Sequence, residues 1–286
     1  MPVPVRRPFA GAALLGFLLR HTVPGVETGS DRAAGKAGEL SYARTLRLPH
    51  GPGLLRLTWA ADRLSADLDA DPRDHDTVLT GLAHLVDADA DAEAVDAHLA
   101  RDPLLGPLVA ATPGLRVPGT LDAAELVVRT LIGQQISMDA ARTCAATITR
   151  RHGEQVDSGV PALGWLFPSV QTLAAVDPTT LPMPRSRGRT LVAVATQLAD
   201  GRLDLSGARS PAEVRTQLLA CPGIGPWTAD YVLMRVRHVP DVLLGSDLVI
   251  RRQLPARGIT DTDSWAPYRS YATMHLWHDF LERSGR

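Results

Sequence analysis

The spacing of apolar residues divides the chain into a β-rich beginning and a longer helical remainder. Residues 9–22 carry apolar side chains at helical spacing and predict a first helix. A Gly/Ala/polar connection follows over residues 27–38. The next part of the chain has β-rich or alternating segments at 40–48, 53–59 and 63–68. These segments predict a small α+β unit with an antiparallel sheet.

From about residue 75 onward the pattern becomes helical. Helices are expected over residues 76–86, 91–101 and 186–200. Three more helices have a capping residue at their start: Thr120 before a helix that runs to Gly133, Ser137 before one that ends at Gly153, and Ser210, which forms a capping box with Glu213.

The composition indicates a globular protein with two or three packed units. The chain has 286 residues, of which 45% are hydrophobic and 21% are charged. No apolar run is long enough to cross a bilayer, so no membrane partner is expected. Arg6 and Arg7 before an apolar run faintly resemble an export signal, but Arg20 and His21 follow at once. We interpret this run as the first helix of the mature fold.

The charge is distributed unevenly, although the net charge is only −1. Residues 60–102 contain twelve of the 31 acidic residues and three of the 30 basic residues. The remainder of the chain therefore has 19 acidic and 27 basic residues, which is basic enough to meet phosphate groups. The acidic stretch itself is expected to be a solvated face.

Cysteine and lysine are both scarce. Cys144 and Cys221 are the two cysteines, and they provide neither a disulfide framework nor a four-cysteine site, so no iron–sulfur cluster and no zinc is expected. His275 and His278 have metal-like spacing, but no further ligands are apparent nearby. Lys36 is the single lysine and is the one candidate for a nucleophilic lysine amine. A reducing cytoplasm is the expected compartment.

Residues 218–231 carry the most information in the sequence. They predict a helix, a tight turn and a second helix, with Gly223 and Gly225 on either side of Ile224. Glycine allows a positive φ and a close approach to a ligand, and Pro226 suits the first position of the second helix. Amide groups exposed at such a turn bind a phosphate without a charged side chain. The alternative is a purely structural turn between two helices.

Asp247 lies downstream of this hairpin, in the segment from Asp241 to Arg252. Taken alone, an aspartate in that position is a helix N-cap. A carboxylate there also interacts with the positive end of the helix dipole, which favours its ionised form. The capping role and a chemical role are therefore compatible.

The string from Pro222 to Ala229, together with Asp247, is similar to the helix-hairpin-helix DNA glycosylase superfamily. Within it, the chain most resembles DNA-3-methyladenine glycosylase II over nearly its whole length. The similar segments are 14–18, 26–27, 41–44, 113–119, 132–137 and 270–277. The resemblance implies a mainly α fold with an N-terminal α+β domain that contains the antiparallel sheet.

The resemblance also suggests how the chain is divided. Residues 1–90 form the N-terminal domain, and residues 120–239 form a helical domain that carries the hairpin at 211–237. Residues 91–119 and 240–286 form a second helical domain with the catalytic aspartate. A cleft is expected between the two helical domains.

The resemblance assigns a role to each candidate site residue. Asp247 is the catalytic carboxylate, and the base pocket consists of Phe17, Trp227, Tyr231 and Trp277. Electron-rich rings stack well on an alkylated, electron-poor base. The loop that enters the DNA contains Gln134, Gln135 and Ile136, and the inserting residue is either Gln135 or Ile136. The phosphate-binding hairpin comprises Gly223, Ile224, Gly225 and Thr228, while Arg251 and Arg187 are candidate phosphate contacts.

The chemistry implied is hydrolysis of an N-glycosidic bond. Bond cleavage builds oxocarbenium character on the sugar, which a fixed carboxylate beside C1′ stabilises before water attacks. Bifunctional members of the superfamily carry a Schiff-base lysine two residues after the second hairpin glycine, where this chain has Trp227. A monofunctional enzyme without lysine-dependent lyase activity is expected.

No cofactor is required by this chemistry. The resemblance suggests Na⁺ or K⁺ at the backbone carbonyls of Cys221, Gly223 and Ile224. The expected partner is double-stranded DNA with a damaged base, and the protein is expected to be a monomer associated with a bacterial nucleoid. Asp230 is a second candidate acid, although a solvated helix position suits it better.

Three hypotheses for the function are compared. The first is excision of alkylated purines of the 3-methyladenine and 7-methylguanine type, which starts base excision repair. The second keeps the chemistry but acts on deaminated, oxidised or bulky-adduct bases. The third is a non-catalytic DNA-binding protein that uses the hairpin as a phosphate clamp. Asp247 distinguishes the enzymes from the binding protein.

Overall fold

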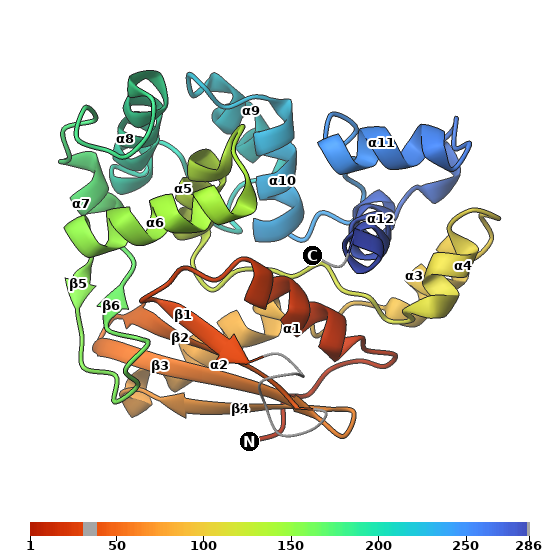
Figure 1. Ribbon diagram of the computed structural model, residues 1–286, viewed down its shortest axis with the longest axis horizontal. Helices are drawn as coiled ribbons and strands as arrows, with labels where there is room; N and C mark the ends of the chain where they lie inside the picture. The colour runs from red at the N-terminus through yellow and green to blue at the C-terminus, as the bar shows by residue number, and fades with distance from the viewer. Residues whose placement is uncertain (31–38, 285–286) are drawn as a thin grey trace.

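The computed structural model describes residues 1–30 and 39–284, with a sheet on one side of the molecule and most helices on the other (Figure 1). The strands are β1 (Glu27–Ser30), β2 (Leu40–Leu48), β3 (Gly51–Ala60), β4 (Arg63–Asp69), β5 (Glu154–Gln155) and β6 (Trp165–Leu166). The helices of the N-terminal half are α1 (Gly11–Arg20), α2 (His75–Leu85), α3 (Ala92–Leu99), α4 (Gly106–Ala111), α5 (Ala123–Gly133) and α6 (Met138–His152). Those that follow are α7 (Val170–Ala174), α8 (Arg185–Ala199), α9 (Pro211–Ala220), α10 (Pro226–Val236), α11 (Leu248–Ala256) and α12 (Arg269–Ser284). The predicted fold class, mainly α with an N-terminal antiparallel sheet, is confirmed.

The sheet has the strand order β1-β2-β3-β4, and all neighbouring strands are antiparallel. The two central strands alternate buried and partly exposed positions, so one face packs on the core. The connection expected over 27–38 is wrong for its first residues, because Glu27–Ser30 pairs with β2 as an edge strand. Its Glu-Thr-Gly-Ser sequence does not alternate apolar and polar residues, so the sequence pattern did not predict a strand. The segment is a strand because it pairs with β2. Lys36 lies outside the described residues.

Two of the three predicted helix caps are confirmed. The Ser137 and Ser210 side chains accept hydrogen bonds from backbone N–H groups of α6 and α9, and Ser210 completes its capping box with Glu213. The expected cap at Thr120 is wrong, because Asp122 caps α5 by accepting a hydrogen bond from Glu125 N at 2.9 Å. The Thr120 hydroxyl instead donates to the Asp122 carbonyl.

The acidic stretch 60–102 is not only a solvated face. Asp74 is buried and accepts hydrogen bonds from the backbone and ring of His50. Asp87 is also buried and accepts a hydrogen bond from the Tyr271 hydroxyl of α12 at 2.9 Å. Asp102 accepts one from the Trp265 indole at 2.8 Å. Asp87 therefore joins the N-terminal unit to α12, and Asp102 contacts the segment that precedes α12.

Three buried apolar clusters hold the molecule together. The largest begins on the sheet and continues through α2, α3 and α4 to α11 and α12. The other two lie among α5 to α10. Figure 1 shows α3 and α4 beside α12, so segments far apart in sequence form one group of helices. Within the described ranges, no helix is both long and apolar enough to span a membrane.

A buried ionic cluster connects the sheet to α5. Arg44 of β2 pairs with Glu125 of α5 at 2.7 Å, and Arg129 of α5 pairs with Glu27 of β1 at 3.1 Å. The Tyr42 hydroxyl also donates to Glu27 at 2.6 Å. Burial opposes ionisation of Glu27, but Arg129 and Arg44 outweigh it and hold the pKa of this carboxyl below its ordinary range.

Candidate active site

The hairpin predicted from the sequence is present between α9 and α10. Gly223 adopts a φ of +88°, and a Cβ on it would lie 2.4 Å from the Thr190 hydroxyl of α8. Ile224 is buried, and its N–H donates to the Cys221 carbonyl at 3.1 Å. Gly225 is the N-cap of α10 and supplies no side chain to cap it. The first N–H groups of α10 are therefore not occupied by a capping side chain, as an anion site requires.

Asp247 is the N-cap of α11 and has an extended backbone conformation. Its Oδ1 accepts hydrogen bonds from Val249 N at 2.9 Å and Ile250 N at 3.1 Å. Two indole N–H groups add to these, from Trp277 to Oδ1 at 3.0 Å and from Trp227 to Oδ2 at 3.3 Å. Four N–H donors thus converge on the carboxylate. They fix its orientation.

Two of the four predicted pocket aromatics, Trp227 and Trp277, contact this carboxylate, and a third, Tyr231, packs against both of them. Trp227 and Tyr231 of α10 stack with ring centroids 5.2 Å apart and planes inclined by 6°. Trp277 of α12 lies 6.2 Å from Tyr231 at an angle of 55°. All three rings are partly exposed. The aspartate and the rings come together where α10 meets α12 and the start of α11.

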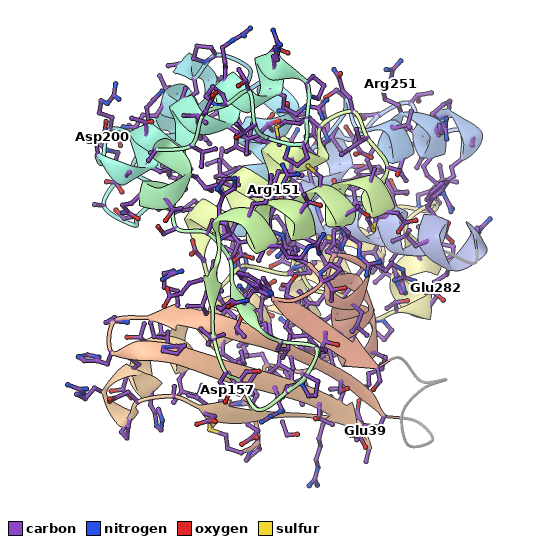
Figure 2. The ribbon with its side chains drawn as sticks, turned by 60° about the vertical axis from the view of Figure 1, so that its left-hand side comes forward. Glu39, Arg151, Asp157, Asp200, Arg251 and Glu282 are labelled. Atoms are coloured by element: carbon purple, nitrogen blue, oxygen red, sulfur yellow. The ribbon has the colours of Figure 1, made fainter. Side chains whose placement is uncertain are left out.

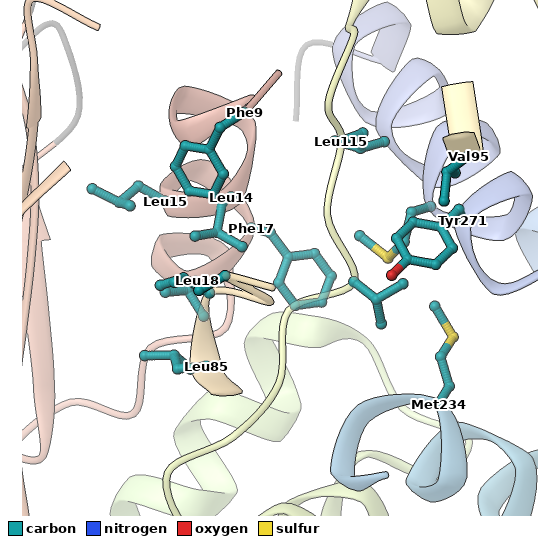
Figure 3. Close-up of a cluster of buried hydrophobic side chains, with 14 of the residues drawn as sticks. Phe9, Leu14, Leu15, Phe17, Leu18, Leu85, Val95, Leu115, Met234 and Tyr271 are labelled. Carbon is teal, nitrogen blue, oxygen red and sulfur yellow. The ribbon is translucent and has the colours of Figure 1, made fainter. Parts of the chain in front are cut away.

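Phe17 lies deeper than the other three aromatic residues. Its side chain is 7% exposed and belongs to the core cluster, into which it projects from α1 (Figure 3). It stacks on His21, with centroids 4.2 Å apart. On another side it meets the Arg235 guanidinium, 4.8 Å from the ring centroid. Phe17 is therefore connected to the aromatic cluster through Arg235 and Tyr231.

Sequence reasoning missed Arg235. It is 5% exposed on α10, and its guanidinium donates to the backbone carbonyls of Pro118 and Gly119 and to the Tyr231 hydroxyl. It also lies 5.4 Å from the Tyr231 ring centroid. The position four residues after Tyr231 places both on one face of the helix, but this spacing does not indicate that the face is buried.

The loop between α5 and α6 lies beside the hairpin. The Gln134 amide donates to the Gly223 carbonyl at 3.2 Å and to the Thr228 hydroxyl at 3.1 Å. Gln135 has a φ of +59° and is exposed, and the exposed fraction of Ile136 is 38%. Gln134 thus ties the loop to the hairpin, while Gln135 and Ile136 form its exposed tip.

The candidate charged residues differ in their surroundings. Arg251 is exposed and points outward from α11 (Figure 2), whereas Arg187 is partly buried near the start of α8. Asp230 does not suit the role of a second catalytic acid, because its carboxylate forms an ion pair with Arg215 of α9 at 2.6 Å. This pair joins the two hairpin helices.

No metal cluster of three or more His, Cys, Asp or Glu side chains occurs within residues 1–30 and 39–284. His275 is buried, and burial lowers its pKa to about 4. Two cavities on the described part of the chain lie near the sheet, one between β2, α2 and α5 and the other between α1 and β1. Asp247 lines neither of these two cavities, so the site at Asp247 is indicated by its hydrogen bonds instead.

The fold is similar to that of solved DNA glycosylases. A 3-methyladenine DNA glycosylase from Archaeoglobus fulgidus superimposes with a TM-score of 0.81 at 17% identity, covering 99% of this chain and 98% of that one. With the glycine turn and the aspartate that follows it, the fold defines the class of helix-hairpin-helix DNA glycosylases. Residues 1–122 match the AlkA N-terminal domain family.

Curated relatives make the classification more specific. DNA-3-methyladenine glycosylase 2 of Escherichia coli is 32% identical, covering 95% of this chain and 94% of the relative. This chain belongs to that AlkA family of DNA-3-methyladenine glycosylases. A probable bifunctional transcriptional activator/DNA repair enzyme AlkA of Mycobacterium tuberculosis is 42% identical over 96% of this chain. The match spans 56% of the length of that relative.

Proposed function

We propose that this protein is a monofunctional DNA glycosylase that excises alkylated purines, of the 3-methyladenine and 7-methylguanine type, from duplex DNA. The observation that carries the proposal is the carboxylate of Asp247, held by two backbone and two indole N–H groups beside three partly exposed aromatic rings. Family membership supports the same activity.

The proposed reaction begins with a base flipped out of the duplex and stacked on the rings of Trp227, Tyr231 or Trp277. A cationic alkylpurine leaves as a neutral base, so its departure needs little help from a general acid. Positive charge builds on the sugar, and Asp247 stabilises it electrostatically. Water then attacks C1′, and the same carboxylate orients it and accepts its proton.

The chain offers two features for holding the duplex. The turn from Gly223 to Gly225 and the uncapped start of α10 would bind a backbone phosphate, and Thr228 supports this turn through Gln134. The exposed loop tip with Gln135 and Ile136 would fill the space that the flipped base leaves. Arg251 and Arg187 are proposed as further phosphate contacts.

A monovalent cation suits the hairpin chemically, because backbone carbonyls are ligands that Na⁺ and K⁺ accept. The carbonyls of Cys221, Gly223 and Ile224 would hold it. The Cys221 carbonyl already accepts Ile224 N–H and the Gly223 carbonyl accepts Gln134, so each would use its second lone pair. The ion would add positive charge where a phosphate binds.

A lysine-dependent lyase step is not proposed. Trp227 occupies the place where bifunctional enzymes carry the Schiff-base lysine, and its indole is bound to Asp247 instead. We further propose that the protein acts as a monomer on damaged double-stranded DNA in a bacterial nucleoid, and that the base enters between the helical domains 120–239 and 91–119 with 240–286.

The proposal is tested by base release from duplexes that carry 3-methyladenine or 7-methylguanine. Asp247→Asn is expected to lower the rate at least about a hundredfold, because it removes the charge that stabilises the transition state. Binding to the duplex should persist. The matched control is Asp230→Asn, which removes a neighbouring carboxylate that pairs with Arg215 and should retain the rate.

Two results would contradict this proposal. If the native protein releases no base from either duplex, a hairpin protein that only binds DNA is the better description. If Asp247→Asn releases base at the native rate, the catalytic role of this carboxylate is wrong.

A further inference from the structure

The hydrogen bond between Arg235 and Tyr231 has only one possible direction. A guanidinium has donors and no acceptor, so the phenol oxygen must accept this bond. The Tyr231 hydroxyl hydrogen must then point elsewhere. Among residues 1–30 and 39–284, no acceptor for this hydrogen is found. The phenol is therefore a donor with an unused hydrogen, at the partly exposed aromatic cluster beside Asp247.

The position of the guanidinium is fixed by the fold. It also donates to the carbonyls of Pro118 and Gly119, and its other neighbour is the Phe17 ring. Burial lowers its pKa, but an arginine keeps its proton under ordinary conditions. A permanent positive charge thus lies behind Tyr231, on the buried side of the aromatic cluster.

We propose that Arg235 makes Tyr231 a dedicated hydrogen-bond donor to the departing base, and that this pair sets the preference between neutral and cationic lesions. Tyr231 is the specificity-determining residue, and Arg235 is a positioning residue that acts through it. The inference rests on the proposed glycosylase activity and adds a determinant to it.

The physical basis is the charge on the leaving group. A neutral purine such as hypoxanthine leaves with developing negative charge on its ring, which a donor to a ring acceptor stabilises. A cationic base such as 7-methylguanine becomes neutral as it leaves, so the same donor has little to stabilise. The Arg235 charge strengthens the donor and also opposes stacking of a cation on Tyr231. Both effects favour the neutral base.

The test compares single-turnover base release from two duplexes, one with hypoxanthine and one with 7-methylguanine. Tyr231→Phe keeps the ring and removes the hydroxyl. It is expected to lower the ratio of the hypoxanthine rate to the 7-methylguanine rate about tenfold, the size of one hydrogen bond to a charged group. The matched control is Tyr268→Phe, at a partly exposed tyrosine immediately before α12, which should leave the ratio unchanged.

Arg235 is tested through the same ratio. Arg235→Met should lower it in the direction of Tyr231→Phe, and Arg235→Lys, which keeps the charge, should restore part of it. If Arg235→Met does not fold, as judged by circular dichroism, Tyr231→Phe alone decides.

The outcomes separate this inference from the proposed function. An unchanged ratio in Tyr231→Phe overturns the inference while the glycosylase proposal stands. Release of 7-methylguanine without any release of hypoxanthine by the native protein also overturns it. If the native protein releases neither base, both proposals fail.

Discussion

The indole of Trp277 donates a hydrogen bond to the Oδ1 atom of Asp247 at 3.0 Å, so one predicted pocket ring also orients the predicted catalytic carboxylate. Trp277 lies on α12 and Asp247 caps α11. Because Oδ1 also accepts two backbone N–H groups of α11, it is fully engaged. Oδ2 has the single indole of Trp227 at 3.3 Å. Oδ2 is therefore the oxygen with capacity left for a sugar or a water.

Removal of the Trp277 donor is expected to slow the chemical step. Trp277→Phe keeps an aromatic ring but loses the N–H, and a hydrogen bond to a charged group contributes about 1.5–3 kcal/mol. Because this bond orients the carboxylate, single-turnover release at saturating enzyme should fall by roughly tenfold to a hundredfold. Trp227→Phe removes the longer bond and should cost less. Equal losses in both variants would contradict this order.

The local parts of the site were predictable because their signals lie close together in the sequence. The turn at Gly223 and Gly225 follows from backbone chemistry within a few residues, and it formed as expected. The resemblance to the superfamily placed Asp247 at the start of a helix, and it is the N-cap of α11. The error at Thr120 shows the limit of this reasoning, since Asp122 offers an equivalent capping oxygen two residues later.

The long-range parts were not predictable from one sequence. Glu27 and Arg129 are separated by 102 positions and become a buried pair only after β1 and α5 are brought together. The burial of Arg235 was also not predictable, because a single arginine on a helix usually faces solvent. Its burial depends on the backbone of Pro118 and Gly119, in a segment without regular structure.

The two hairpin glycines should respond differently to alanine. Gly223→Ala places a Cβ against Thr190 in a left-handed backbone conformation and should lower the free energy of unfolding by roughly 1–3 kcal/mol. Gly225 has a φ of −94° and open space around its Cβ position, so Gly225→Ala should leave stability nearly unchanged. It should weaken DNA binding instead, because the new methyl group would occupy the approach of a phosphate. Urea unfolding measures the change in stability, and fluorescence anisotropy measures the change in DNA binding. A destabilised Gly225→Ala would contradict the assignment of Gly225 to phosphate binding rather than to folding.

The buried ionic cluster should stabilise the junction between the sheet and α5. Arg44→Met leaves the buried Glu125 without its 2.7 Å partner, and removing one member of a buried pair costs about 3–5 kcal/mol. The control is Arg47→Met, three residues along the same strand. Its partner Glu154 is exposed, and such pairs contribute about 0–1 kcal/mol. Urea denaturation of both variants measures the difference, and similar losses would show that the buried cluster is not a special source of stability.

His275 should make the protein less stable in mild acid. Its pKa of about 4 in the fold lies below the ordinary value of 6.5, because burial disfavours the charged ring. The unfolded chain therefore binds the extra proton, and the free energy of unfolding falls as the pH drops through 6.5 and levels off below about 4. For one such histidine the loss between pH 7.5 and pH 5 is about 2 kcal/mol. His275→Phe keeps a ring of similar size and should remove the part of the stability loss that His275 causes. His21 and His238 also have lowered pKa values, so their contributions to the loss should remain. Urea unfolding across this pH range measures it, and parallel curves for the native protein and His275→Phe would show that His275 titrates alike in both states.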